Sequence, residues 1–156
     1  MSTTVRVTYD QFEDMIRHGE LSGTDDRYEL IFGEVCLMPV PDPPHESVTS
    51  KLTAWSVRSL PEAAAEVRVQ CTLGIPSLDS MTLPDVAWMR MRSYFEHRPL
   101  PEDVLLVIEV SDSSLYKDRN QKAKLYAQAG IADYWIVNIP KRRLEIRRGP
   151  EGDGYK

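Results

Sequence analysis

Two acids at the ends of apolar segments are the residues of this chain best suited to chemistry. Glu109 closes the apolar run LLVIEV, and Asp85 stands directly before VAWM. A buried charge without a partner costs several kcal/mol, so each acid must be paired, protonated or bound to a metal. If the two strands are neighbours, the carboxylates repel each other by roughly 4 kcal/mol at about 4 Å and an effective dielectric of about 20.

A divalent cation, Mg²⁺ or Mn²⁺, would remove that repulsion, because such ions bind one or two carboxylates and complete their shell with water or phosphate oxygens. Alternatively, each acid caps a loop amide or pairs with a nearby arginine.

A helix is predicted directly after the second acid. In KDRNQKAKLYAQAG (117–130) Asp118 is a plausible N-cap and Gln121 completes a pattern similar to a capping box. Gly130 suits the left-handed position that often ends a helix. The helix therefore begins close to the end of the strand that carries Glu109.

A lysine early in this helix is the third candidate. Lys122 would lie in the first turns, where the helix macrodipole slightly disfavours a cation. It either pairs with Asp118 one turn earlier, or reaches back to Glu109. In the second case its ammonium could orient an attacking water or stabilise charge on a phosphate. Lys117 and Lys124 compete for that role, although Lys124 falls on a different face of the helix.

Three polar residues are secondary candidates. Glu29 adds an acid from a predicted hairpin, or occupies an exposed strand position. His45 opens a predicted helix and is either a ligand or simply an N-terminal helical residue. Gln70 alternates with apolar residues and points either to the site or to solvent. Tyr126 and Trp135 are expected in the core.

The composition is that of a soluble globular protein. The chain has 156 residues, of which 42% are hydrophobic and 28% charged, and this predicts a single domain over 1–156. The net charge of −5 argues against a strong nonspecific nucleic-acid binder, but not against an enzyme that acts on nucleic acid. The basic stretch KRRLEIRR (141–148) is either a solvated hairpin face or a phosphate-binding surface.

Cysteine usage and hydropathy indicate the compartment. Cys36 and Cys71 form no CxxC motif and no zinc-like cluster with the three histidines, so free thiols in a reducing cytoplasm are expected. No apolar run approaches the roughly 20 residues that cross a bilayer. The stretch MSTTVRVTYD also lacks the apolar core of a secretory signal. We therefore expect a cytoplasmic protein without membrane contact.

The first part of the chain is predicted to contain two helices and a hairpin. Thr8 and Gln11 have the spacing of a capping box, and the apolar stripe after them ends at Gly19. Residues 27–38, RYELIFGEVCLM, are typical of a tight hairpin. A proline-rich connection then leads to a second helix over 45–60.

The rest of the chain is predicted to be mostly strands. The strand–helix–strand order across 104–139 indicates a right-handed parallel crossover within a mixed sheet. The last strand ends just before GPEGDGYK, so we expect either that the chain is a fragment or that a further segment covers this edge. The predicted strands are EVRVQCTLGIP (66–76), PDVAWM (84–89), VLLVIEV (104–110), DYWIVNI (133–139) and RLEIRR (143–148).

Several of these segments together resemble a known family. PDVAWM, LLVIEVSDSS and KDRNQKAKLYAQAGIADYWIVN are similar to the Uma-type family of putative restriction endonucleases, within the PD-(D/E)xK nuclease superfamily. RYELIFGEVCLMPVPDPPHESV also resembles that family, and the resemblance covers residues 8 to 148. It implies an α/β, restriction-endonuclease-like fold: a central mixed sheet flanked by helices, with an N-terminal helix and β-hairpin. It also implies metal-dependent cleavage of phosphodiester bonds.

The resemblance further implies roles for single residues. Asp85 matches the aspartate of the PD element, and Glu109 matches the acid of the second element. Ser111 stands where the superfamily has the lysine of its ExK element. In the family that this chain resembles, a lysine of the following helix takes that role, and Lys122 fits it. Asp118 would then fix Lys122.

These inferences combine into one prediction with two alternatives. We expect an Mg²⁺-dependent (or Mn²⁺-dependent) endonuclease that hydrolyses DNA, with the metal on Asp85 and Glu109 and with Lys122 as the catalytic cation. The alternatives are a catalytically inactive interaction module of the same fold, and a nuclease for RNA or branched nucleic acid. A homodimer is expected, because two copies of one site most simply cut both strands of a duplex.

Overall fold

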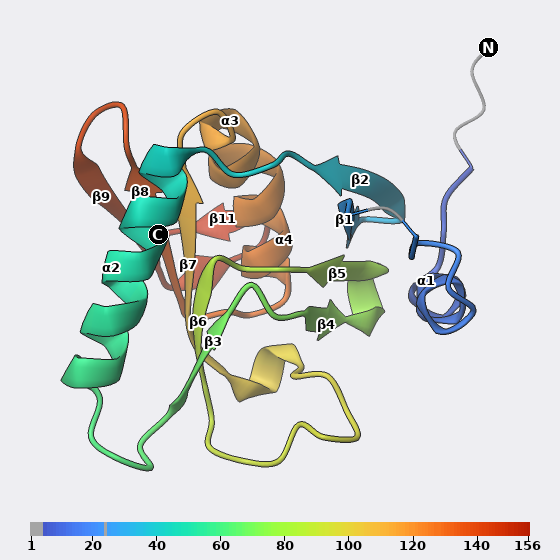
Figure 1. Ribbon diagram of the computed structural model, residues 1–156, viewed down its shortest axis with the longest axis horizontal. Helices are drawn as coiled ribbons and strands as arrows, with labels where there is room; N and C mark the ends of the chain where they lie inside the picture. The colour runs from blue at the N-terminus through green and yellow to red at the C-terminus, as the bar shows by residue number, and fades with distance from the viewer. Residues whose placement is uncertain (1–4, 24) are drawn as a thin grey trace.

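The computed structural model describes residues 5–23 and 25–156. Within these ranges a five-stranded sheet lies beside a four-stranded sheet, and helices pack against both (Figure 1). A short hairpin near the C-terminus forms a third, two-stranded sheet. No helix in the described part of the chain is both long and apolar enough to cross a bilayer.

The five-stranded sheet has the order β3-β6-β7-β8-β9. Strands β7 and β8 are parallel, and the other neighbours are antiparallel. The predicted mixed sheet and its parallel pair are therefore confirmed. Its strands are β3 (Glu66–Val69), β6 (Val86–Met89), β7 (Val104–Ser111), β8 (Asp133–Asn138) and β9 (Arg143–Arg148).

The four-stranded sheet has the order β2-β1-β5-β4 and contains the predicted N-terminal hairpin. The first helix lies against it, with Phe12 packed on Leu30 and Met81. The capping box of Thr8 and Gln11 is present as predicted. The elements are α1 (Tyr9–Arg17), β1 (Arg27–Ile31), β2 (Glu34–Met38), β4 (Leu73–Ile75), the 3₁₀ turn η1 (Pro76–Leu78) and β5 (Ser80–Thr82).

The prediction of one strand over 66–76 is wrong. The chain leaves β3 after Val69 and enters β4 at Leu73, and these two strands belong to different sheets. Gln70 at the break has a φ of 49°, the left-handed conformation, which interrupts an extended strand. Alternation of apolar residues continues across the break, so the hydrophobic pattern alone does not reveal it.

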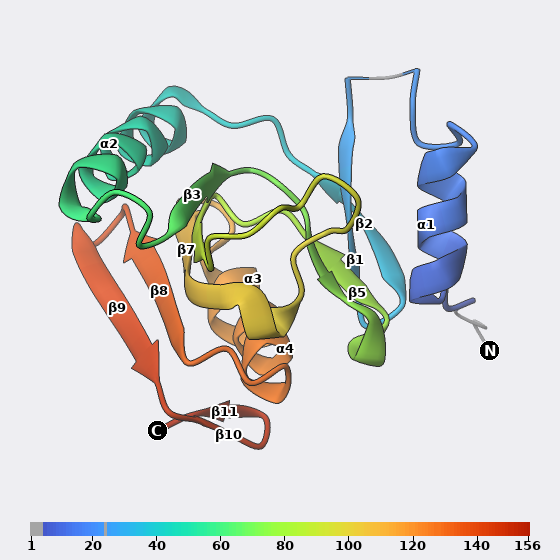
Figure 2. The ribbon, with the colours of Figure 1, turned by 90° about the horizontal axis from the view of Figure 1, so that it is seen from below.

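Helices cover both faces of the five-stranded sheet. The long α2 (Pro43–Ser59) lies on one face, and α3, η3 and α4 lie on the other (Figures 1 and 2). Helix α2 begins at Pro43, earlier than predicted, because proline is tolerated in the first turn and Asp42 caps it. The remaining helical elements are the 3₁₀ turn η2 (Pro101–Asp103), α3 (Leu115–Lys117), the π-helix η3 (Asp118–Lys122) and α4 (Ala123–Gln128).

The predicted N-cap role of Asp118 is also wrong. Helical backbone already begins at Leu115, and Asp118 lies inside it with φ −68° and ψ −36°. The five residues from Asp118 to Lys122 form a π-helical turn, a rare conformation that is often found at functional sites. The helix ends near Gly130, whose φ of 77° fits the predicted left-handed end.

Alternation along β7 decides which face each of its side chains occupies. Val107 packs with Ala123 and Tyr126 on the α4 side of the sheet. Ile108 packs on the α2 side, in a cluster that includes Leu52. Because side chains two apart share a face, Glu109 lies on the α4 side with Val107.

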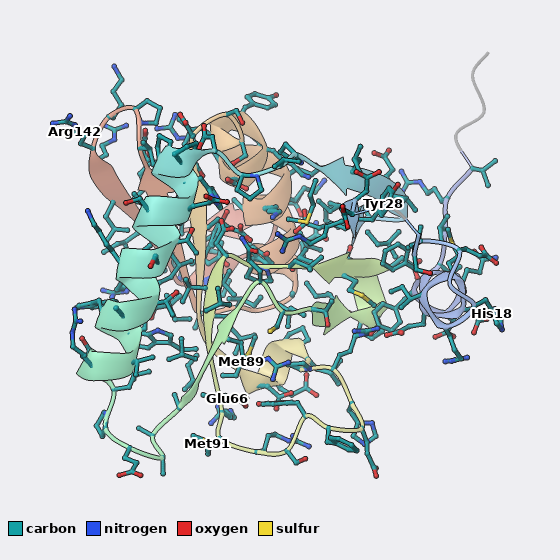
Figure 3. All side chains as sticks on the ribbon, in the orientation of Figure 1. His18, Tyr28, Glu66, Met89, Met91 and Arg142 are labelled. Atoms are coloured by element: carbon teal, nitrogen blue, oxygen red, sulfur yellow. The ribbon has the colours of Figure 1, made fainter. Side chains whose placement is uncertain are left out.

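The two ends of the sheet are distinguished in Figure 3. Arg142, in the β8–β9 turn, lies at the same end as α3, and Met89, at the end of β6, lies at the opposite end. The start of β6 and the carboxyl ends of β7 and β8 therefore meet beside α3.

The C-terminal residues form a hairpin of β10 (Pro150–Glu151) and β11 (Gly154–Tyr155). This hairpin lies beside α4 (Figure 2), and the Tyr155 hydroxyl donates to the carbonyl of Ile131. The two cysteines, Cys36 and Cys71, are free thiols, as predicted.

Candidate active site

Antiparallel pairing of β6 and β7 brings the two predicted acids together. Val86 pairs with Ile108, so Asp85 lies next to the end of β7. The amide of Val110 donates to Asp85 Oδ2 at 2.7 Å. Asp85 is 6% exposed and Glu109 3% exposed, so both acids are buried at the same end of the sheet.

Both acids line one cavity of about 300 Å³. Its walls come from both sheets and from the helical segment after β7, and the connection between β2 and α2 contributes Pro39, Val40 and Pro41. Carboxylates outnumber cations among the lining side chains. The lining groups used below are Glu29, Asp85, Glu109, Lys117, Asp118 and Lys122.

Lys122 lies between two carboxylates at the inner end of this cavity. Its Nζ is 3.2 Å from Glu109 Oε1 and 3.0 Å from Glu29 Oε1. The side chain is 5% exposed. Of the two contacts considered from the sequence, the one back to Glu109 is present. Ion pairs of Lys122 in the described structure run to Glu29 and Glu109, and not to Asp118.

Asp118 instead accepts hydrogen bonds from two serines. Ser111 Oγ and Ser114 Oγ both donate to Asp118 Oδ2. Burial raises the pKa of Asp118, while the charge of Lys122 and the two hydroxyls oppose that rise. Ser111, two residues after Glu109, therefore holds an acid of the helix. The Tyr134 hydroxyl donates to the carbonyl of Asp118 at 2.8 Å and fixes the π-helical turn.

Glu29 is a buried member of the site, so its reading as an exposed strand residue is wrong. Strand β1 pairs with β5, and this places Glu29 Oε1 2.9 Å from the amide of Leu83. Lys117 Nζ lies 3.5 Å from the other oxygen, Oε2. Glu29 is 1% exposed, and together with Lys122 it joins the two sheets.

Tyr126 is the site residue that sequence reasoning missed, since we expected only a core role. It is fully buried, and its hydroxyl lies 2.9 Å from Glu109 Oε1 and 3.0 Å from Thr82 Oγ1. A usable signal was present in the sequence: Tyr126 follows Lys122 by four residues, so both lie on one helix face. Its ring packs edge-on against Tyr134 at 4.9 Å.

His45 contacts the first acid from the start of α2. Its Nε2 lies 3.1 Å from Asp85 Oδ1, and its amide donates to the capping carboxylate of Asp42. The hydrogen bond with Asp85 raises the pKa of His45. Burial alone would raise the pKa of Asp85, but His45 and the amide of Val110 hold it below its usual value.

Gln70 lies at the border of the cavity. Its Oε1 accepts a hydrogen bond of 2.6 Å from Arg27. Of the two orientations considered from the sequence, the one toward the site is present, because Gln70 lines the cavity.

The buried charges set the protonation of the inner site. Burial would lower the pKa of Lys122, but the carboxylates of Glu109, Glu29 and Asp118 raise it well above its usual value, so the amine is charged. Burial raises the pKa of Glu109 well above the usual range, and nearby acids add to that rise against the charge of Lys122. The site has more carboxylates than Lys122 can neutralise.

The donor set suits a hard cation that keeps part of its own shell. Asp85 and Glu109 offer carboxylate oxygens, and the hydrogen bonds described for Glu109 all end on Oε1. Residues 5–23 and 25–156 contain no group of three or more histidine, cysteine or acidic side chains that could enclose a metal. Mg²⁺ requires no such group, since it is commonly bound by one or two carboxylates with water and phosphate oxygens. The two acids therefore fit Mg²⁺ as an open site.

Comparisons with known proteins agree with this architecture. A family model named Uma2 and described as "Putative restriction endonuclease" matches residues 9–156. A solved structure of a putative nuclease belonging to DUF820, from Anabaena variabilis, matches with a TM-score of 0.60. It is 16% identical, and the match covers 94% of this chain and 87% of that chain, so the likeness concerns the fold. It confirms the predicted fold class. The curated proteins gave no match.

Proposed function

This chain belongs to the Uma2 family of putative restriction endonucleases, and we propose that it hydrolyses phosphodiester bonds of DNA with Mg²⁺ as cofactor. The observation that carries the proposal is the position of Lys122. It places a buried cation between Glu109 and Glu29, in a cavity that Asp85 also lines. A cation and two carboxylates that could hold a metal ion, all in one cavity, are groups that can promote phosphodiester hydrolysis.

Asp85 and Glu109 would hold the metal ion. When bound there, Mg²⁺ would polarise the phosphate and lower the pKa of a bound water. The excess of carboxylates in the cavity supports a cation requirement, because an anionic phosphate entering without one would meet net negative charge. Mn²⁺ has the same preference for oxygen ligands and would serve as a substitute.

The protein's own groups would orient the reactants. Lys122 would stabilise negative charge on the phosphate or position the attacking water, and Glu29 would hold its ammonium in place. Tyr126 would hold Oε1 of Glu109. Asp118 would act on Lys122 through its charge, since its hydrogen bonds go to Ser111 and Ser114.

Calorimetric titration with Mg²⁺ or Mn²⁺ tests the metal site, and nicking of supercoiled plasmid tests the activity. We expect the wild type to bind and to nick, whereas Glu109→Ala and Asp85→Ala lose metal binding and at least about 100-fold of the rate. Glu34→Gln, at an exposed acid of β2, is the control and should match the wild type. Metal-dependent cleavage that persists in both alanine variants would contradict the assignment.

The same experiment separates this proposal from its alternatives. A wild type that binds no metal, even with DNA added as a source of phosphate, would indicate an inactive interaction module, which the carboxylate-rich cavity also permits. Comparison of duplex DNA, single-stranded DNA, branched DNA and RNA as substrates decides which nucleic acid is cut.

We also propose that the protein forms a homodimer and that it acts in the cytoplasm. Strand β9 is the last strand in the order of its sheet, and Leu144 and Ile146 on it are 45% and 46% exposed. Pairing of two copies along this edge would cover these apolar side chains. Analytical ultracentrifugation of the wild type and of Ile146→Lys tests it, with a monomeric wild type as the contradicting result.

A further inference from the structure

We propose that Lys117 binds a phosphate of the substrate strand at the mouth of the cavity, by exchanging Glu29 for a phosphate oxygen. This inference rests on the proposed nuclease function and adds a substrate-contacting residue to it. The observation that carries it is a difference between two ion pairs of Glu29: the pair with Lys122 is short and buried, whereas the pair with Lys117 is longer and partly exposed.

Lys122 cannot leave its position without a large penalty. It is within 3.2 Å of two carboxylates, Glu109 and Glu29, and its side chain is 5% exposed. Its departure would leave both acids buried and without their cation. Lys122 therefore acts where it is, at the inner end of the cavity.

Lys117 is held much more weakly. Its Nζ lies 3.5 Å from Glu29 Oε2, and its side chain is 31% exposed. A partly solvated ion pair at this distance is easily exchanged. When Lys117 leaves, Glu29 keeps two partners on its other oxygen, Lys122 and the amide of Leu83. The exchange therefore leaves no buried acid unpaired.

The position of Lys117 suits a phosphate next to the one that reacts. It lines the same cavity as Lys122, on the helical turn directly before the π-helix. A long flexible side chain with three donors can follow a phosphate at the cavity mouth while Lys122 stays fixed. Arg27, the third cation of the lining, instead donates to the neutral amide of Gln70 at 2.6 Å.

Lys124 offers a matched control. It belongs to the same helical segment, but it does not line this cavity, and its Nζ is 3.9 Å from Asp153. Its side chain is 50% exposed. Removing its charge changes the net charge of the protein as much as removing that of Lys117, without changing the cavity.

The test is steady-state cleavage of a fluorescently labelled DNA strand in Mg²⁺, at salt concentrations from about 50 to about 200 mM. For Lys117→Met we expect KM to rise about 5- to 20-fold, with kcat within about 3-fold of the wild type. In a plot of log(kcat/KM) against the logarithm of the salt concentration, the negative slope should become shallower by about one unit. This is the change expected when one phosphate contact is lost. Lys117→Arg should stay close to the wild type, and Lys124→Met should match it.

Each other outcome has a definite meaning. If Lys117→Met keeps the wild-type KM and salt dependence, or if Lys124→Met shows the same change, the inference is overturned while the nuclease function stands. If Arg27→Met raises KM and Lys117→Met does not, the phosphate contact belongs to Arg27 and the inference is again overturned. If the methionine variant does not fold, Lys117→Gln decides by the same criteria. A wild type that cleaves no nucleic acid overturns both the inference and the proposed function.

Discussion

The ammonium of Lys122 lies 3.2 Å from Glu109 Oε1, across the boundary between a helix and a strand. The same ammonium lies 3.0 Å from Glu29, which is 93 positions away in the sequence. One buried cation thus connects β7, β1 and the π-helical turn. The same three side chains therefore join the two sheets and take part in the proposed chemistry of the site.

Removal of this cation should destabilise the fold as well as the site. In Lys122→Met, Glu29 and Glu109 remain buried without their shared cation, and we expect a loss of about 3 to 5 kcal/mol in the free energy of unfolding at pH 7. Urea denaturation followed by circular dichroism measures it. Lys124→Met is the control, because its exposed ion pair contributes less than about 1 kcal/mol.

The cause of that loss can be separated from lost packing. If stranded carboxylates cause it, Lys122→Met combined with Glu109→Gln should be more stable than Lys122→Met alone. If the double variant instead loses as much stability as the Lys122→Met and Glu109→Gln single variants together, lost packing is the cause. Cleavage should be reduced at least about 100-fold in both variants, because the cation proposed to stabilise the phosphate is absent.

Tyr126→Phe should weaken metal binding with only a moderate loss of stability. The hydroxyl holds Glu109 Oε1, and outer groups of this kind typically change metal affinity about 10- to 100-fold. The free energy of unfolding should fall by about 1 to 3 kcal/mol, because a buried hydrogen bond is lost. Calorimetry with Mg²⁺ gives the affinity, and urea denaturation gives the stability.

Thr82→Val provides the comparison for Tyr126. It removes the second partner of the Tyr126 hydroxyl and leaves the contact with Glu109 in place. The two variants should lose similar stability, but only Tyr126→Phe should lose metal affinity. Equal losses of affinity would show that the hydroxyl acts through general packing rather than through Glu109.

Local signals in the sequence were sufficient for most elements of the fold. The capping box at Thr8, the apolar run of β7 and the glycine at 130 depend on neighbouring residues only, and each was predicted. The break at Gln70 depends on a left-handed backbone angle between two strands of different sheets. Apolar alternation carries no information about that angle, so one strand was predicted where there are two.

The sequence predicted the site residues that local signals mark, but not those whose role depends on contacts between distant segments. Asp85, Glu109 and Lys122 were marked by acids at strand ends and by a lysine in the next helix. The burial of Glu29 depends on the pairing of β1 with β5, a contact between distant segments. The role of Tyr126 was missed for a related reason. An aromatic residue on a buried helix face is normally core, and the contact of its hydroxyl with Glu109 becomes visible only once the helix packs against β7.

Glu145 on β9 should contribute stability that is lost in acid. Arg119 donates to both of its carboxylate oxygens, from Nε at 3.0 Å and from Nη2 at 2.5 Å. These hydrogen bonds, with a further one from Asn138, lower the pKa of Glu145 from 4.5 to about 2. Because the pKa is lower in the folded state than in the unfolded state, the ion pair stabilises the fold above pH 4.5. The contribution decreases below pH 4.5 and is lost as the pH falls through about 2.

The expected signature is a stability difference that depends on pH. Because solvent screens this partly exposed pair, Glu145→Gln should lose roughly 1 kcal/mol at pH 7 relative to the wild type. That difference should shrink steadily as the pH is lowered below 4.5 and through the folded-state pKa of about 2, since protonated glutamate and glutamine bind Arg119 alike. Urea denaturation at several pH values measures it, with Glu151→Gln, at an exposed pair of 3.8 Å, as the control. A difference that stays constant from pH 7 to pH 2 would mean that Glu145 stabilises β9 by its shape and neutral hydrogen bonds, and not by its charge.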